Sequence, residues 1–168
     1  MGQKSYWLTN NTLDIMTWKL RYAEAHKQWQ LKEYPASCKD FGWISPKYPD
    51  VRTSNGLTRM ILYFLKWEGW RATRVSSAGR LVAKNERMPS GVVLQGKGWI
   101  PSTTRKGSAD ISATVKGKSI MIEVKIGRDK PSEHQLREQE LERKAGGIYE
   151  FVSTPDEFFD LYDKILLT

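Results

Sequence analysis

Apolar residues recur at helical spacing in two stretches of the first half of the chain. Trp18, Tyr22, Ala25 and Trp29 follow one another at intervals of three or four residues, which predicts a helix over residues 17–33. Such a row is typical of core packing, and a platform for nucleobases is the less favoured alternative. A second apolar face, starting near residue 54, consists of Leu57, Met60, Ile61, Phe64 and Leu65. Between the two helices, the prolines and glycine of residues 34–55 predict an irregular connector.

The second half alternates between apolar and polar positions. Residues 109–115 and 119–126 predict two strands joined by a tight turn at residues 116–118, and so a hairpin. In its second strand, Ile120 and Ile122 point to one side, while Glu123 and Lys125 point to the other. Helices are predicted over 132–145 and from 154 onward, and strands over 70–75, 80–83, 91–94 and 148–152. The glycine-rich and basic segment 96–107 predicts a flexible loop.

The order of these elements predicts an α/β fold. From residue 54 it reads helix, strands, hairpin, helix, strand and helix, which indicates a mixed sheet covered by helices. The length of 168 residues is enough for one substantial core. We therefore expect an N-terminal helical extension at 1–52 and a core domain at 53–168. No apolar run approaches the length that spans a bilayer, and no signal peptide is evident, so we expect a cytoplasmic protein without a membrane partner.

Composition and charge narrow the possible chemistry. One cysteine and two histidines cannot supply an internal disulfide or a four-ligand zinc site, whereas a carboxylate site for a hard cation stays possible. The net charge is +8, and residues 51–110 hold eleven Lys and Arg against three Asp and Glu. This stretch would attract a polyanion such as nucleic acid, although a basic surface that serves solubility is an equally simple reading.

Two carboxylates and one ammonium group are expected to meet in the hairpin. A turn centred on Gly117 places Asp110 opposite about residue 124, and therefore beside both Glu123 and Lys125. Two carboxylates can jointly bind Mg²⁺, and a neighbouring ammonium can assist an attacking water or a phosphate. These are the groups that phosphodiester hydrolysis needs. By spacing alone, an ordinary ion pair on a half-solvated strand is the favoured explanation of Glu123 and Lys125.

Two further polar residues have both a structural and a functional interpretation. Ser132 and Gln135 fit a capping box, in which the glutamine reaches back to the helix start. Gln135 could instead turn into the site and bind a water or a phosphate oxygen. Asn55 is likewise a candidate N-cap, and it is a site residue only if its helix end faces the same cleft.

Four short motifs in fixed order resemble the PD-(D/E)xK nuclease superfamily. They are GSADI at 107–111, IEVK at 122–125, SEHQ at 132–135 and GGIY at 146–149. The sequence TSNGLT at 53–58 also resembles the opening of the core helix in phage members. The similarity covers about two thirds of the chain and is closer to the VRR-NUC branch, which includes phage-type enzymes that resemble Holliday junction resolvases.

The resemblance implies a restriction-endonuclease-like core and a metal-dependent DNA endonuclease that acts on structured or branched DNA with little sequence specificity. Asp110, Glu123 and the carbonyl of Val124 would bind Mg²⁺ or Mn²⁺, Lys125 would assist the water, and Gln135 would orient it or a phosphate. A homodimer is plausible, in a bacterial or phage-infected cell. The alternative is a non-catalytic DNA-binding module. The residues expected to hold DNA are Asn55, Arg59, Arg74, Arg80, Lys97, Arg105 and Lys106.

Overall fold

The computed structural model describes residues 18–75, 80–87, 89–90, 93–100 and 106–168, and for 80–87 and 93–100 it describes the backbone alone. It divides the chain into two compact units, residues 1–46 and residues 47–168. The division expected from the sequence lay six residues later, after residue 52. Each unit is described by itself below.

The N-terminal unit contains two helices. α1 (Trp18–Glu33) confirms the first predicted helix. α2 (Pro35–Phe41) lies within the segment 34–55, for which the prolines and glycine predict an irregular connector. Proline at the first position of a helix sacrifices no hydrogen bond, since that amide has no partner within the helix. The side chain of Gln30 then fastens the following segment to α1, donating to the carbonyl of Ile44 at 3.1 Å and accepting from its amide at 2.9 Å.

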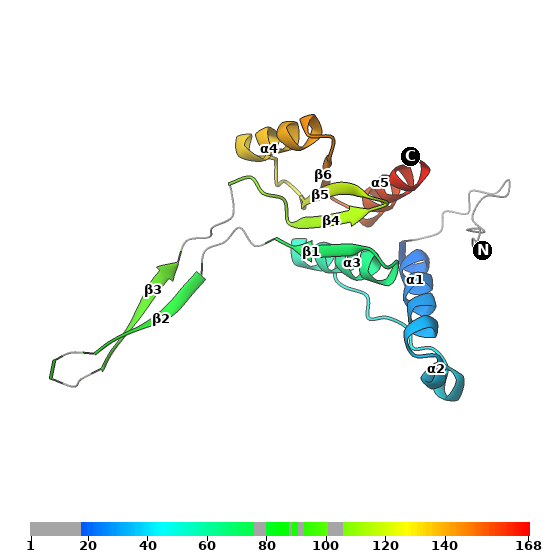
Figure 1. Cartoon of the computed structure of the whole chain (residues 1–168), viewed down its shortest axis with the longest axis horizontal. Helices are drawn as coiled ribbons and strands as arrows, with labels where there is room; N and C mark the ends of the chain where they lie inside the picture. The colour runs from blue at the N-terminus through cyan, green and yellow to red at the C-terminus, as the bar shows by residue number, and fades with distance from the viewer. Residues whose placement is uncertain (1–17, 76–79, 88, 91–92, 101–105) are drawn as a thin grey trace. The chain divides into compact units, whose positions relative to one another are not determined.

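The second unit is built on a four-stranded sheet in the order β1-β4-β5-β6 (Figure 1). Its strands are β1 (Arg71–Arg74), β4 (Ile111–Val115), β5 (Lys118–Val124) and β6 (Ile148–Val152). β1 and β5 both pair antiparallel with β4, while β6 pairs parallel with β5. The fold is therefore α/β with a mixed sheet, as the order of elements predicts.

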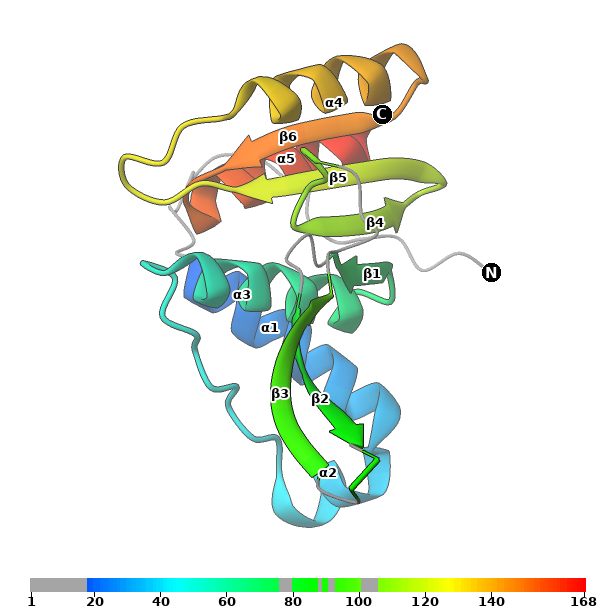
Figure 2. The same cartoon turned by 90° about the vertical axis from the view of Figure 1, so that its left-hand side faces the viewer.

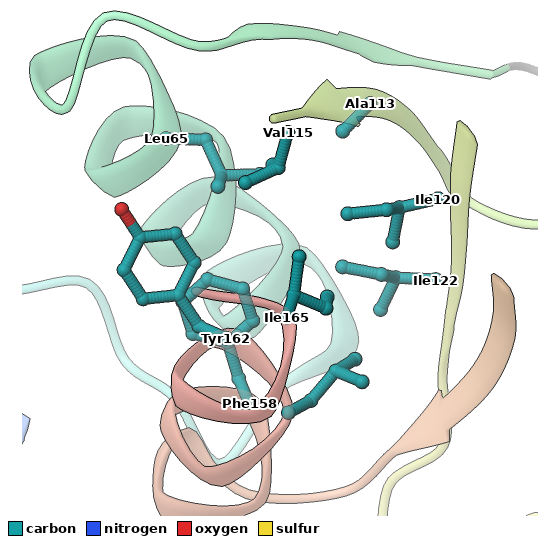
Figure 3. A pocket seen from close by; sticks show the side chains of 9 residues that line it. Leu65, Ala113, Val115, Ile120, Ile122, Phe158, Tyr162 and Ile165 are labelled. Carbon is teal, nitrogen blue, oxygen red and sulfur yellow. The ribbon is translucent and has the colours of Figure 1, made fainter. Parts of the chain in front are cut away.

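Two amphipathic helices cover the apolar face of this sheet. α3 (Ser54–Trp67) and α5 (Pro155–Leu167) meet through Phe64, whose ring makes edge-on contacts with Phe158, Phe159 and Tyr162. Figure 3 shows Ile120 and Ile122 pointing from β5 toward these helices. The cavity in this core has a volume of about 10 Å³ and an entirely apolar lining, so it is a small packing gap, with room for about one water molecule and no polar partner for it.

The third helix of this unit attaches to the sheet by polar contacts. α4 (Glu133–Lys144) runs alongside β6 (Figure 2) and has no buried residue. The Gln139 amide donates to the carbonyl of Tyr149 at 2.9 Å, and the Ser119 hydroxyl donates to Glu142 at 2.7 Å. Among the described helices, none combines the length and apolar character needed to cross a membrane.

The β4–β5 hairpin is confirmed, but its register differs by one residue from the prediction. The turn consists of two residues, Lys116 and Gly117, with φ angles of +50° and +80°. Positive φ at both positions is the signature of the type I′ turn, which matches the twist of paired strands. Ile111 therefore pairs with Ile122. This register continues to Asp110 opposite Glu123, rather than about residue 124.

The prediction of a flexible loop over residues 96–107 was wrong for its first part. β3 (Val93–Ile100) pairs antiparallel with β2 (Arg80–Arg87) in a separate two-stranded sheet (Figure 1). Gly96 and Gly98 argued against a strand because glycine has a low β propensity, but pairing with a partner strand overrides that weak preference. Lys97 thus lies in a strand.

Candidate functional site

Asp110 and Glu123 are locked together where β4 begins and β5 ends. The backbone amide of Asp110 donates to Glu123 Oε2 at 3.1 Å, and the backbone amide of Val124 donates to Asp110 Oδ2, also at 3.1 Å. Each carboxylate is therefore held by the backbone of the opposite strand. This reciprocal arrangement follows from the register, because it needs the two acidic residues to face each other directly.

Lys125 lies beside Glu123 and is buried with it. Its Nζ is 3.3 Å from Glu123 Oε1 and 3.3 Å from Asp129 Oδ2. Only 7% of Glu123 and 8% of Lys125 is exposed. An ordinary ion pair on a half-solvated strand would be far more open, so the burial argues against that alternative. Charged groups are rarely buried to this extent without a specific role or partner.

Gln135 forms the expected capping box and also reaches the carboxylate cluster, while its expected binding of a water or a phosphate oxygen stays a prediction. Its backbone amide donates to the Ser132 hydroxyl and its Oε1 accepts from the Ser132 amide, which completes the capping box at the start of α4. The other end of the same side-chain amide donates to Glu123 Oε1 at 2.5 Å. The cap thus fixes the glutamine and aims its NH₂ group at the carboxylate cluster.

The segment before Asp110 is held by Gly107 and Tyr149, which belong to two of the motifs named above but were given no role there. Gly107 has φ +87°, and a Cβ atom there would lie 2.4 Å from the carbonyl oxygen of His134 in the first turn of α4. Only glycine fits so close an approach at that backbone angle. Tyr149 donates from its hydroxyl to the carbonyl of Gly107 at 3.0 Å. Its place in a predicted strand was visible in the sequence, but this long-range bond was not.

The electrostatics of the cluster favour a bound cation. Burial raises the pKa of Glu123, and the negative charge of Asp110 raises it further, while Lys125 and the hydrogen bonds to Glu123 oppose the shift. The pKa of the Tyr149 hydroxyl is also raised, by burial first and then by the charges of Glu123 and Asp110. Negative charge therefore accumulates here at a cost that a cation would offset.

The carboxylate pair fits a magnesium-like ion better than a metal that needs many protein ligands. The described residues contain no cluster of three or more His, Cys, Asp and Glu side chains arranged to hold a metal. Mg²⁺ commonly uses one or two carboxylates and fills its other positions with water and substrate phosphate. In the described part of the chain, Asp110 Oδ1 accepts no hydrogen bond, which leaves it available as a ligand. Binding by the Val124 carbonyl stays a prediction.

Some of the residues predicted to hold DNA lie next to this cluster. Arg74 donates to Asn55 Oδ1 at 2.6 Å, and the amide of the following residue, Val75, donates to the Asp110 carbonyl at 2.8 Å. The N-cap of α3 is Thr53, whose hydroxyl accepts from the Gly56 amide, so capping does not explain Asn55.

The remaining predicted DNA contacts are spread along the chain. Arg59 is exposed one turn along α3 from Asn55, and Lys106 is exposed just before Gly107. Arg80 and Lys97 are backbone positions of β2 and β3 with side chains outside the description, and Arg105 lies outside the described residues.

The N-terminal unit has a separate groove of about 350 Å³. It is lined mainly by apolar and aromatic side chains of α1, α2 and the segment after α2 that contains Ile44. Trp29, Tyr34 and Phe41 are among them. It contains none of the residues predicted to be catalytic or to hold DNA.

No protein-family model matches this chain, and no curated protein matches it either. The resemblance to PD-(D/E)xK nucleases therefore rests on the motifs at residues 107–111, 122–125, 132–135 and 146–149 and on the segment 53–58. Independently of it, the structure shows an α/β core with a mixed sheet, and an enclosed cluster of two carboxylates, one ammonium and one amide at the end of β5.

Proposed function

We propose that this chain is a divalent-cation-dependent DNA endonuclease with a restriction-endonuclease-like core. One observation carries the proposal: Asp110, Glu123, Lys125 and Gln135 converge through specific bonds, and Glu123 and Lys125 are buried there. Enclosed ionisable groups concentrate at functional sites, because a fold gains little stability from burying them, and burial raises the pKa of Glu123 here.

Each residue has a chemical role that its position supports. Asp110 and Glu123 would hold Mg²⁺ or Mn²⁺, which when bound polarises the phosphate and makes a water more acidic. Lys125 would orient that water and balance the charge that develops on the phosphate. Gln135 keeps Glu123 in place through its side-chain amide. The backbone bonds to both carboxylates fix them before a substrate arrives, so that little reorganisation is needed.

The DNA interface would begin at Arg74 and Asn55, next to Asp110, and continue through Arg59 and Lys106. These side chains would bind phosphates rather than bases. We therefore expect little sequence preference and an affinity for DNA that falls steeply as the salt concentration rises. Branched or otherwise structured DNA is the substrate that the resemblance favours. A homodimer also stays a prediction.

The direct test is a cleavage panel with Mg²⁺ or Mn²⁺ on supercoiled, branched and single-stranded DNA. We expect Asp110→Asn and Lys125→Met to reduce cleavage by about 100-fold or more, the usual scale for losing one group that stabilises a transition state. Asp160→Asn changes an exposed carboxylate on α5 and serves as the matched control. If all substrates stay intact with wild type, but bind it in a salt-dependent way, the chain is a non-catalytic DNA-binding module instead.

A second readout needs no DNA. At a Mg²⁺ concentration ten times its dissociation constant, binding should stabilise the folded protein by about 1.4 kcal/mol, and Asp110→Asn should lose this gain. An equal Mg²⁺ effect on thermal unfolding in wild type and Asp110→Asn would rule out the carboxylate pair as the cation site.

A further inference from the structure

One face of α3 presents a regular row of four residues, and two of them, Tyr63 and Trp67, have no role in the proposed cleavage. Asn55, Arg59, Tyr63 and Trp67 occur at intervals of four, so they lie on the same side of the helix. The first three are exposed and Trp67 is half-buried. At about 1.5 Å per residue, Tyr63 lies about 12 Å along the helix from Asn55. Along this distance, which is comparable to the length of a few nucleotides, the side chains of the row change from polar to cationic to aromatic.

The row starts beside the candidate active site. Asn55 accepts the hydrogen bond from Arg74, and the residue after Arg74 bonds to the Asp110 backbone. A DNA strand with a phosphate near Asp110 would meet Arg74 first and Arg59 next. Tyr63 then lies one further turn along the same face, so a strand held by the two arginines passes its ring.

Tyr63 has the geometry of a stacking platform. Its ring stacks on that of Trp67, with centroids 5.8 Å apart and planes 23° from parallel. Trp67 thus fixes the orientation of the ring from one side, while 46% of Tyr63 remains exposed. Single exposed aromatics are common, but a ring held in place beside arginines is the arrangement by which proteins bind unpaired bases.

The charge around the row fits a nucleic acid better than another partner. Residues 50–75 contain five basic side chains and two acidic ones: Asp50, which pairs with Arg52, and Glu68, whose carboxylate accepts a hydrogen bond from the Tyr162 hydroxyl. An apolar partner would have to desolvate cations of this stretch such as Arg59, whereas a phosphate backbone neutralises them. Stacking then adds an attraction to the bases themselves.

From this geometry we infer that Tyr63 stacks on an unpaired nucleobase of a DNA strand whose phosphates are held by Arg59 and Arg74. A base inside a continuous duplex is already stacked on both faces against its neighbours, so it cannot stack on the Tyr63 ring. The substrate must therefore offer a single-stranded segment, such as a gap, a flap or an open branch, where the strand reaches Tyr63, about two turns of α3 beyond Asn55. The inference rests on the proposed function and specifies its substrate.

The test measures binding without cleavage. In EDTA, a single-stranded oligonucleotide containing 2-aminopurine and a blunt duplex of the same sequence are titrated with wild type, Tyr63→Ala and Tyr63→Phe. We expect Tyr63→Ala to bind the single strand about five- to tenfold more weakly, the lower part of the range for stacking on one base, and to lose quenching of 2-aminopurine. Tyr63→Phe should behave as wild type, because it keeps the ring.

Two controls separate stacking from other causes. Arg59→Ala should weaken single strand and duplex alike, since it removes a phosphate contact. Leu141→Ala, at an exposed apolar position on α4, should change neither. Circular dichroism verifies that each variant is folded.

The possible failures are distinguishable. If Arg59→Ala weakens binding and Tyr63→Ala does not, or if Tyr63→Ala affects duplex and single strand equally, stacking is overturned while the nuclease proposal stands. If Tyr63→Ala changes the oligomeric state measured by sedimentation, the face binds a second copy of the chain and the inference is wrong. An inactive cleavage panel together with intact, ring-dependent binding of the single strand would refute the nuclease alone.

Discussion

The two faces of β5 are made by alternate residues of one strand, yet they are stabilised in opposite ways. On one face, Ile120 and Ile122 are almost fully buried against α3 and α5. On the other face, the charged side chains of Glu123 and Lys125 are buried. The helix on that face, α4, has no buried residue and is attached through hydrogen bonds. The apolar face supplies the favourable free energy of burial, and the polar face consumes part of it.

This contrast separates the face that carries the proposed site from the face that forms the core. Because α4 has no buried residue, it contributes little apolar packing to the sheet. It does supply the side-chain amide of Gln135, which donates to Glu123, and its first turn packs against Gly107. Its polar attachment is thus a consequence of forming the carboxylate cluster. If the proposed function is correct, stability depends mainly on the apolar face and cleavage on the polar face, and substitutions on each face should separate the two.

The largest effect on stability is expected on the apolar face. Ile122→Ala removes a side chain that is 1% exposed and enlarges the small cavity it lines, so unfolding should become easier by about 2–5 kcal/mol. Met121→Ala, the neighbour on the polar face and only partly buried, should cost clearly less. Urea denaturation of both variants measures the difference. Equal losses would mean that the two faces do not differ in packing.

A smaller effect, with a distinct pH dependence, is expected on the polar face. The pKa of Glu123 is raised in the folded protein, so its contribution to stability is fully present below its ordinary pKa of 4.5 and is lost as the pH rises through the folded value. Glu123→Gln cannot titrate. In EDTA, wild type should therefore lose stability relative to this variant as the pH rises above about 4.5.

The urea midpoint between pH 4 and pH 8 gives this measurement, with Glu140→Gln on the exposed side of α4 as the control. A difference between wild type and Glu123→Gln that stays constant with pH would show that Glu123 is not shifted. Added Mg²⁺ should reduce the loss at higher pH, because a cation stabilises the charged carboxylates.

Elements with strong local signals could be predicted from the sequence. The apolar periodicity of α3 and the alternation along β5 identified their core faces, and Thr154 followed by proline marked the start of α5. The capping box of Ser132 and Gln135 is also local, and it is present. In each case, the information lies within a few residues.

What the sequence did not determine depends on distant partners or on the detail of a turn. The register moved by one residue because Lys116 and Gly117 form a two-residue turn. The burial of Glu123 and Lys125 depends on residues far along the chain, so spacing could not distinguish a surface ion pair from an enclosed cluster. Asp129 contacts Lys125 only because the turn around Gly127, with φ +65°, brings it back toward the lysine.

The smallest expected effect gives the sharpest comparison, because each face has a helix with the same kind of cap. The Ser132 hydroxyl accepts from the Gln135 amide at the start of α4, and the Thr154 hydroxyl accepts from the Glu157 amide at the start of α5. Ser132→Ala and Thr154→Ala should each cost about 1 kcal/mol of stability, since each leaves one amide at a helix start without its acceptor.

Only Ser132→Ala should also reduce cleavage, by several-fold at saturating DNA, because it loosens the side-chain amide of Gln135 that holds Glu123. Parallel urea and cleavage measurements decide the matter: if both variants lose stability alike and neither changes cleavage, the cap of α4 supports the helix alone and Gln135 finds Glu123 without it.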